Sequence, residues 1–199
     1  MLIRNQKKEI CMINSYNKKK SNSGVTLVEM LITGVVFSII FGVAIGTFTS
    51  VVRIQKYNLS QQQLLDQSSY AIEYIARALR MAKKDETNLC GNGAVSYAVK
   101  DGGTRIEFLN YKDQCQEFFL DTSWGYYMIR VERPDFSFNP ELNSYKYIVN
   151  DLTFVVSGDN PGDNLQPRVT IFMDIQDREL ADGPRLKLQT TVSQRNIDR

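Results

Sequence analysis

The sequence contains no histidine, the side chain that most often acts as a general base at neutral pH and as a metal ligand. It also lacks a G-x-S-x-G elbow, a phosphate-binding P-loop, a G-x-G-x-x-G turn and paired C-x-x-C motifs. No combination of residues in the chain calls for catalysis. We therefore expect that the protein is not an enzyme and uses no cofactor.

Charge is distributed unevenly along the 199 residues. Residues 1–24 hold six basic side chains against one acidic side chain, a net charge of +5, whereas the remainder carries −3. The basic excess thus belongs to a short N-terminal segment. Because no basic patch in the rest of the chain suggests a nucleic-acid groove, we expect no nucleic-acid partner.

Cysteine is scarce, with Cys11, Cys90 and Cys115 as the three examples. Cys11 lies in the basic segment, and the other two fall in a later, strand-like part of the chain. They can form a disulfide if that part is exported from the cytoplasm. Closing this loop would add roughly 3 kcal/mol of stability in the chain-entropy model. The alternative is two free thiols packed as small apolar groups.

A long apolar segment follows the basic one. From Val25 to Val52 the only ionisable side chain is Glu29. A helix of this length exceeds the ~30 Å hydrocarbon core of a bilayer. The lysines before it place the N-terminus in the cytoplasm by the positive-inside rule. A secretory signal fits less well, because its small-residue cleavage site follows the apolar core. We expect a single membrane span with the rest of the chain outside.

Apolar residues recur at spacings of three and four beyond this span, which predicts an amphipathic helix over residues 53–84. Neither proline nor glycine interrupts the pattern. We therefore expect one helix from about Val25 to Lys84, whose second half packs a single stripe onto the rest of the protein. The expected stripe consists of Leu65, Ser68, Ile72, Ile75, Leu79 and Ala82.

Residues 85–199 have patterns typical of strands. Asp101-Gly102-Gly103 is a hairpin turn signal, and the alternating apolar residues from Val169 to Ile175 form one face that is expected to be buried. The expected fold class is α+β, a long N-terminal helix packed on an antiparallel sheet. Strands are expected within residues 94–100, 104–110, 116–120, 125–131, 145–156, 168–175 and 186–192.

Glu29 is unusual, because a carboxylate inside an apolar helix costs about 2.5–3.5 kcal/mol at the middle of a membrane. One interpretation is an interfacial glutamate without a role, since the cost falls near a helix end. The other requires a positive partner. Cleavage after Gly24 would give Val25 a new α-amine, and in an assembly of parallel helices a neighbour's amine would neutralise Glu29. Such a buried pair can define the register between subunits.

The stretch Gly24-Val25-Thr26-Leu27-Val28-Glu29 resembles the type IV prepilin cleavage and methylation signature: a basic leader, a glycine before the cut, then Thr-Leu-x-Glu and an apolar helix. The resemblance implies that a prepilin peptidase cuts between Gly24 and Val25 and N-methylates Val25, with Glu29 as the assembly carboxylate. Two features depart from the pattern. Val25 replaces the usual phenylalanine or methionine, and the leader is long; a start at Met12 would shorten it to thirteen residues.

The downstream sequence resembles minor pilins and pseudopilins of the J or W type in the general character and order of its segments, without a strict motif. This implies a pilin-like fold and a role in a type IV pilus or type II secretion filament. The implied partners are other pilin-like subunits, an assembly platform and its ATPase. The implied location is the bacterial cytoplasmic membrane, with the C-terminal domain periplasmic or extracellular, and then the filament.

The expected organisation has four parts: a cleaved leader (1–24), a transmembrane and assembly helix (25–52), its amphipathic continuation (53–84) and a globular β domain (85–199). The alternative interpretation is an uncleaved single-pass membrane protein with an extracellular binding or adhesion domain. In that case residues 1–24 stay attached and Glu29 is dispensable.

Oxygen-bearing side chains gather in the stretch SGDNPGDN, where Asp159 and Asp163 are the candidate calcium ligands. In the family that the chain resembles, major pseudopilins bind calcium in a C-terminal loop. However, the stretch lacks EF-hand spacing, and Asn-Pro and Gly-Asp are ordinary turn sequences. We expect a solvated turn and no metal.

Overall fold

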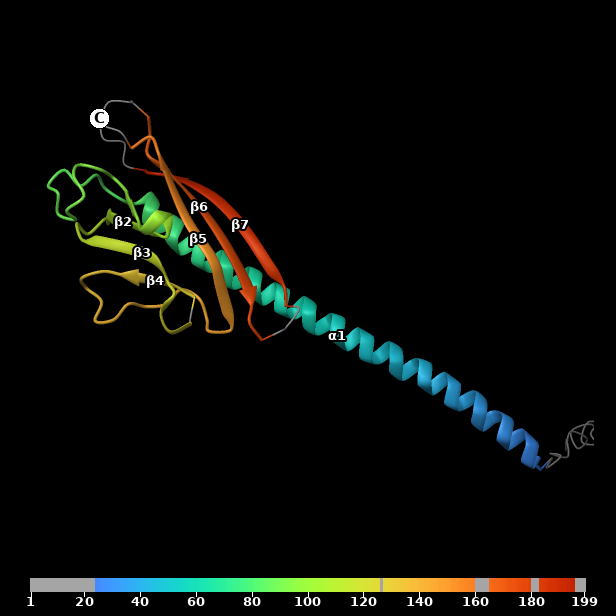
Figure 1. Cartoon of the computed structure of the whole chain (residues 1–199). Helices are drawn as coiled ribbons and strands as arrows, with labels where there is room; N and C mark the ends of the chain where they lie inside the picture. Colours follow the sequence, from blue (N-terminus) through green and yellow to red (C-terminus); the bar gives the residue numbers. More distant parts are fainter. Residues whose placement is uncertain (1–23, 126, 160–164, 180–182, 196–199) are drawn as a thin grey trace, which may run out of the picture. The chain divides into compact units, whose positions relative to one another are not determined.

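The computed structural model describes residues 24–125, 127–159, 165–179 and 183–195. Cys11, Met12 and Asp163 lie outside the described residues. The chain divides into two compact units, Met1–Ser50 and Val51–Arg199. Helix α1, Leu27–Arg80, contributes residues to both units (Figure 1).

In the first unit the described residues are the entry to α1 and its apolar part. Every residue from Gly24 to Ser50 is exposed. Among the described residues, α1 is the one helix long and apolar enough, by length and composition, to cross a membrane. The hydroxyls of this part donate hydrogen bonds to backbone carbonyls of the preceding turn, as seen at Thr33, Ser38, Thr47 and Thr49. These hydroxyls thus need no water, which suits a helix in lipid.

In the second unit α1 packs through a single stripe of residues, although the stripe differs from the expected one. Leu65 is 39% exposed, so its assignment was wrong, whereas Ile72 is partly buried and packs against the core. Leu64, one position before Leu65, is buried in its place, and Ala71, next to Ile72, is also buried. The buried residues of α1 are Ser60, Leu64, Ser68, Ala71, Ile75 and Leu79, at the spacings of four and three that one helix face requires.

The helix ends at Arg80 rather than near Lys84, because the backbone groups of Arg80 and of the residues just after it bond to other segments. The backbone carbonyl of Arg80 accepts a hydrogen bond from the N–H of Arg195 at 2.9 Å, and that of Ala82 accepts one from Gln194 Nε2 at 3.0 Å. The N–H of Lys83 in turn donates to the carbonyl of Leu109 at 2.9 Å. These bonds satisfy the helix terminus and join it to both sheets.

The α+β fold class is confirmed, but the strands form two antiparallel sheets instead of one. The first sheet has the order β1-β2-β3-β4, with β1 at Ala98–Lys100, β2 at Arg105–Leu109, β3 at Cys115–Asp121 and β4 at Met128–Glu132. The second has the order β5-β6-β7, with β5 at Tyr147–Ser157, β6 at Arg168–Asp177 and β7 at Arg185–Ser193. Short 3-10 turns cover Asp101–Gly103 and Ser123–Gly125.

The division into two sheets has a local cause at the free edge of β4. The connection to β5 folds back along this edge, where the N–H of Val131 bonds to the carbonyl of Pro140 at 3.0 Å and the N–H of Leu142 bonds to the carbonyl of Ile129 at 2.9 Å. An isolated bridge pairs Arg130 with Glu141. Because these contacts occupy the edge groups of β4, β5 pairs with β6 instead.

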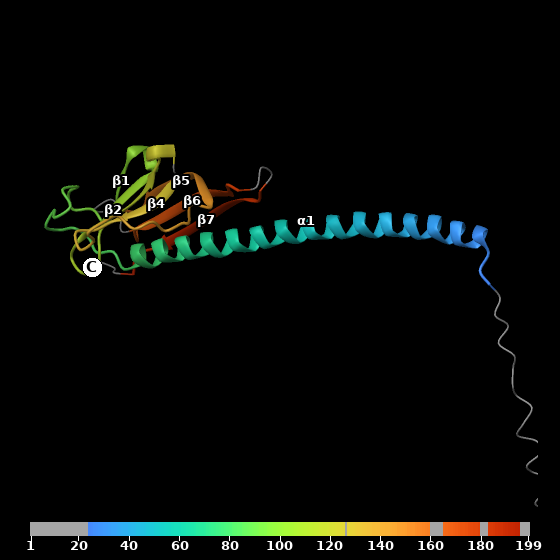
Figure 2. The ribbon, with the colours of Figure 1, turned by 90° about the horizontal axis from the view of Figure 1, so that it is seen from below.

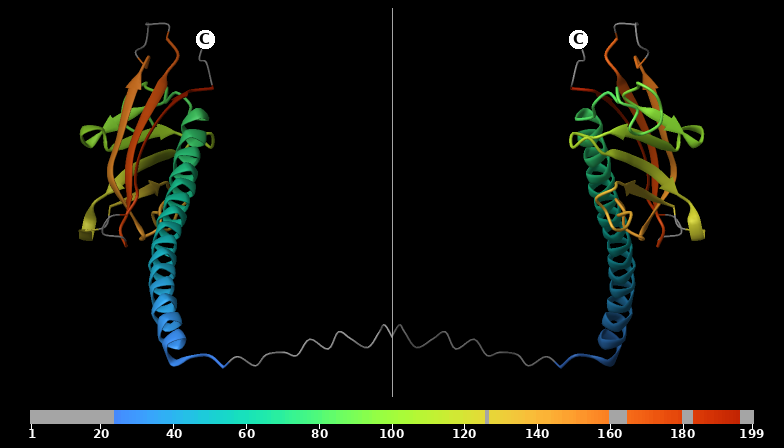
Figure 3. Two further views of the ribbon diagram at one scale, coloured as in Figure 1. Left: turned by 90° about the vertical axis from the view of Figure 1, so that its right-hand side faces the viewer. Right: turned by 90° about the vertical axis from the view of Figure 1, so that its left-hand side faces the viewer.

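One hydrophobic core joins the helix stripe to both sheets. Phe118 comes from the first sheet, Phe154 and Ile171 from the second, and Ile75 from the helix. The predicted burial of alternate residues in β6 is confirmed, since Val169, Ile171, Met173 and Ile175 are all at most 2% exposed. Figures 2 and 3 show the strands gathered on one side of the C-terminal part of α1.

Candidate functional site

The residues of the prepilin-like signature lie at the entry to α1. Gly24 and Val25 precede the helix and are exposed. A Cβ atom built on Gly24 would meet nothing within 4 Å, so packing among the described residues does not require glycine at this position. Glu29 is the third residue of the helix and its first-turn acid.

Thr26 has a structural role at the start of α1 that the sequence analysis did not predict. The N–H of Glu29 donates a hydrogen bond to Oγ1 of Thr26 at 3.3 Å, so Thr26 serves as the N-cap. Thr-x-x-Glu is the sequence of a capping box, and this pattern could have revealed the cap. The carboxylate also lies where the positive end of the helix dipole stabilises negative charge.

The carboxylate of Glu29 makes no hydrogen bond or ion pair with any residue that the structure describes. Along the described helix the first basic residue is Arg53, beyond the whole apolar part. A positive partner for this carboxylate must therefore come from the leader, from a new chain terminus or from another molecule.

Cys90 and Cys115 are joined by a disulfide, with their Cα atoms 5.5 Å apart. Cys90 lies in the loop between α1 and β1, and Cys115 begins β3. The buried carboxylate of Asp85 stabilises the same loop by accepting the N–H groups of Leu89 and Cys90, each at 2.8 Å. The carboxylate thus fixes the conformation of the loop itself, and the disulfide attaches the loop to β3 of the first sheet.

The disulfide also argues against a metal at the one group of potential ligands found among the described residues. Sulfur atoms of Cys90 and Cys115 and a carboxylate oxygen of Glu107 lie within 4.8 Å of one another. Sulfur in a disulfide is not a thiolate, which is the form that binds metals. Glu107 instead pairs with Lys100, whose Nζ lies 2.5 Å from Oε2, and accepts a hydrogen bond from Asn92.

Three glutamates oppose one another across the first sheet, because Glu107 pairs in register with Glu117 and Glu117 with Glu132. Burial opposes ionisation of Glu107, but hydrogen bonds from Lys100 and Asn92 outweigh it and lower its pKa. Burial raises the pKa of Glu117, and the charge of Glu107 adds to this, although Arg105 bonds to Glu117. Lys100 and Arg105 thus offset the repulsion that the glutamates on adjacent strands would otherwise cause.

Asp159, one of the two calcium candidates, binds backbone amides. Its Oδ1 accepts the N–H of Ser96 at 3.0 Å and its Oδ2 accepts the N–H of Tyr97 at 3.1 Å. Tyr97 in turn donates its hydroxyl hydrogen to the carbonyl of Leu79 at 2.7 Å. Burial, together with the charge of Asp159, raises the pKa of Tyr97. Asp159 therefore connects the end of β5 to the loop before β1. The other candidate, Asp163, lies outside the described residues.

Comparisons of the chain with protein-family models, with curated proteins and with solved structures found no match of any of the three kinds. What the chain does must therefore be inferred from its own residues and their arrangement.

Proposed function

We propose that the protein is a minor pilin or pseudopilin. It is a membrane-inserted precursor that a prepilin peptidase cuts between Gly24 and Val25, and then a structural subunit of a type IV pilus or type II secretion filament. The observation that carries this proposal is the Gly24–Glu29 signature at the start of a helix whose residues through Val51 are all exposed. An apolar helix exposed on every side needs lipid or other helices around it.

Glu29 provides the assembly chemistry. Removal of the leader creates an α-amine at Val25, and N-methylation keeps its positive charge. When helices gather side by side, a neighbour's amine pairs with Glu29, and this pairing offsets the cost of holding a lone carboxylate in an apolar bundle. Because the pair forms at one stagger of the two helices, it also defines how far each subunit is displaced along the filament.

A stripe of small residues on the same helix supports packing between helices. Gly34, Ser38, Gly42 and Gly46 follow one another at intervals of four residues. A Cβ atom at any of these three glycines would meet nothing within 4 Å, so the chain's own fold does not require them. Small residues four apart let helix backbones approach closely in membranes and in bundles.

The charge and redox features support the proposed location. Lys18, Lys19 and Lys20 precede the apolar segment and favour a cytoplasmic N-terminus. The Cys90–Cys115 disulfide favours an oxidising compartment for the second unit, as expected outside the cytoplasm. The implied partners are the prepilin peptidase, an assembly platform with its ATPase, and other pilin-like subunits.

The test is the intact mass and N-terminal sequence of the protein recovered from membranes that contain a prepilin peptidase. We expect a chain that begins at N-methylated Val25. Gly24→Val should block the cut by placing a branched side chain before it, while Ser23→Ala, one position earlier, should leave processing unchanged. A wild-type chain that retains residues 18–24 would overturn the proposal and favour an uncleaved, single-pass binding or adhesion protein.

A further inference from the structure

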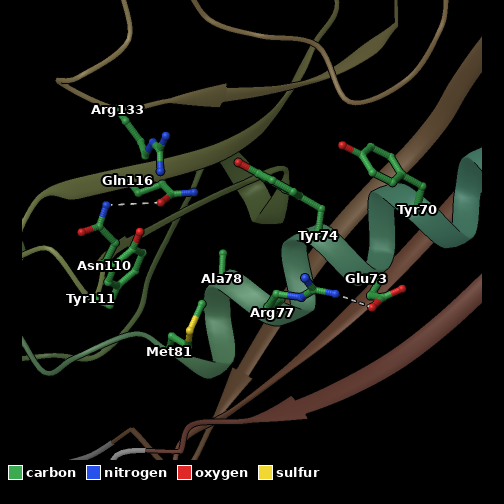
Figure 4. Close-up of a pocket in the computed structure, with 10 residues that line it drawn as sticks. All are labelled: Tyr70, Glu73, Tyr74, Arg77, Ala78, Met81, Asn110, Tyr111, Gln116 and Arg133. Atoms are coloured by element: carbon green, nitrogen blue, oxygen red, sulfur yellow. Dashed lines mark hydrogen bonds and ion pairs between the residues drawn. The ribbon is translucent and has the colours of Figure 1, made fainter.

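A cavity of about 290 Å³ lies within the second unit, between the C-terminal part of α1 and the first sheet (Figure 4). This volume is near the lower end of the range of about 300–1,000 Å³ typical of small-molecule sites. The residues important for its chemistry are Tyr70, Tyr74 and Arg77 from the helix and Tyr111, Gln116 and Arg133 from the strands and their connections.

The walls of the cavity present aromatic surface. Tyr70 and Tyr111 are 58% and 52% exposed and come from the helix and from the β2–β3 turn. Tyr74 lies deeper, and its ring packs edge-on against Phe118 with the ring centroids 6.1 Å apart. These rings offer flat apolar faces together with hydroxyl groups, so they suit a ligand that is apolar on its faces and polar at its edge.

Gln116 contributes a hydrogen-bond donor to the lining of the cavity. The residue is only 3% exposed, and its Oε1 lies 3.4 Å from Nδ2 of Asn110. Its amide nitrogen has no hydrogen-bond partner among the residues that the structure describes. In Figure 4 this nitrogen points toward the hydroxyl end of Tyr74. This nitrogen is therefore free to donate a hydrogen bond to an acceptor on a ligand in the cavity.

Arg133 adds a positive charge above Gln116 (Figure 4). Its guanidinium carbon lies 3.9 Å from the centroid of the Phe136 ring. Its Nε is 3.1 Å from Oδ1 of Asp135, yet this contact lacks hydrogen-bond geometry and the buried Nε makes no hydrogen bond within the described part of the chain. Arg133 is thus ion-paired with Asp135, and its two terminal Nη groups, which make no hydrogen bond with the described residues, are the donors that an anionic ligand can reach.

The remaining charges at the cavity neutralise each other, because Arg77 Nη2 lies 2.6 Å from Oε1 of Glu73. The site is therefore rich in donors and bordered by aromatic rings, and the counter-ion of Arg133, Asp135, does not line the cavity. A ligand that matches it has a carboxylate, further oxygen acceptors and a flat C–H surface.

We propose that this cavity binds a uronic acid, a sugar ring that carries a carboxylate. Arg133 and the Gln116 amide donate hydrogen bonds to the carboxylate, and the rings of Tyr70 and Tyr111 cover the C–H faces of the sugar. A neutral sugar lacks the anion that Arg133 favours. An acidic amino-acid side chain supplies a carboxylate but neither the flat C–H surface nor the additional hydroxyl oxygens.

The experiment is a calorimetric titration of the purified full chain in detergent micelles with three probes: glucuronate, glucose and N-acetylglutamate amide. We expect saturable binding of glucuronate, with the other two probes binding about tenfold or more weakly. Glucose lacks the carboxylate, and N-acetylglutamate amide lacks the sugar ring. Equal binding of glucose would overturn the role of the carboxylate. Tighter binding of N-acetylglutamate amide would replace the sugar with an acidic peptide, and no binding of glucuronate would refute the site.

Three variants locate the binding. Tyr70→Ala removes one wall, and Gln116→Met removes the amide donor at similar volume. Each variant should weaken glucuronate binding by about fivefold to tenfold. Tyr145→Ala is the matched control, because Tyr145 is also 58% exposed and does not line the cavity. Because Tyr70 is exposed, Tyr70→Ala keeps the test decisive even if Gln116→Met fails to fold. Unchanged binding by Tyr70→Ala, or equal weakening by Tyr145→Ala, would overturn the assignment.

Discussion

Removal of the Cys90–Cys115 disulfide is the perturbation whose effect on stability follows most directly from the structure. The two cysteines are 25 residues apart in sequence. In the chain-entropy model a crosslink over a loop of this size is worth about 3.5 kcal/mol at 25 °C. The double variant Cys90→Ala/Cys115→Ala should therefore lose a large share of the stability of the second unit.

Other contacts between the same segments reduce this value. Asp85 keeps its hydrogen bonds to the amides of residues 89 and 90 in the variant. Lys83 stays paired with Asp113 at 2.7 Å, although both side chains are largely exposed and their pair is worth little. We therefore expect a loss of about 2–3.5 kcal/mol in the free energy of unfolding.

Urea unfolding of the full chain in detergent, followed by tryptophan fluorescence, measures the loss. With a urea m-value of about 2 kcal/mol/M, the midpoint should fall by about 1–1.8 M. Cys11→Ala in every protein leaves Cys90 and Cys115 as the two remaining cysteines. Reduced wild-type protein should then unfold at the same urea concentration as the double variant.

Two results would refute this reasoning. A loss below about 1 kcal/mol would mean that other contacts already restrict this loop in the unfolded chain. The crosslink would then remove little entropy and contribute little to stability. Alkylation of both cysteines in unreduced, denatured protein would mean that the bond does not form in the cell. The second result would also remove the redox support for export of this unit.

Three further predictions test the helix stripe, an ion pair and the assembly carboxylate. Ile75→Ala should lower the free energy of unfolding by about 3 kcal/mol, because Ile75 is fully buried. Leu65→Ala should lower it by less than about 1 kcal/mol, because Leu65 is partly exposed. Similar losses for the two variants in urea titrations would contradict the observed stripe. Hydrogen bonds from Arg185 at 2.6 and 2.7 Å lower the pKa of Asp174, so its stabilisation is present above the ordinary aspartate pKa and is lost as the pH falls through the folded-state pKa. In thermal melts from pH 6 to pH 2, Asp174→Asn should thus lose less stability than wild type, and parallel curves would disprove the linkage. Glu29→Gln removes the charge and leaves the Thr26 cap in place, because the cap binds the backbone N–H of residue 29. This variant should be processed normally yet enter filaments about tenfold less than wild type, while Thr26→Ala should assemble nearly normally. Normal assembly of Glu29→Gln would exclude charge pairing.

The errors in the predicted fold came from long-range packing. Spacing alone places a stripe on a helix only to within one residue, since positions 64 and 65 differ by 100° around the axis. Leu64 and Ala71 are buried because they face the strands, and no local sequence pattern carries that information. The second sheet also depends on distant contacts, because the segment after β4 occupies the edge of β4 and β5 pairs with β6.

The sequence by itself determined the features that depend on neighbours along the chain. These are the long helix, its exposed apolar part, the turn at Asp101–Gly103 and the alternating burial of β6, all of which follow from periodicity and turn chemistry. The Gly24–Glu29 signature is also local, and its proposed role does not need the tertiary structure.

Only the tertiary structure decided which distant residues meet. It joined Cys90 to Cys115, used Asp159 to bind the amides of the loop before β1, and brought Tyr70 and Gln116 to opposite sides of one cavity. These residues are 25 to 63 positions apart, and each contact depends on how the strands pair and on how the helix is rotated about its axis. The short-range patterns that encode helices and strands do not specify either quantity.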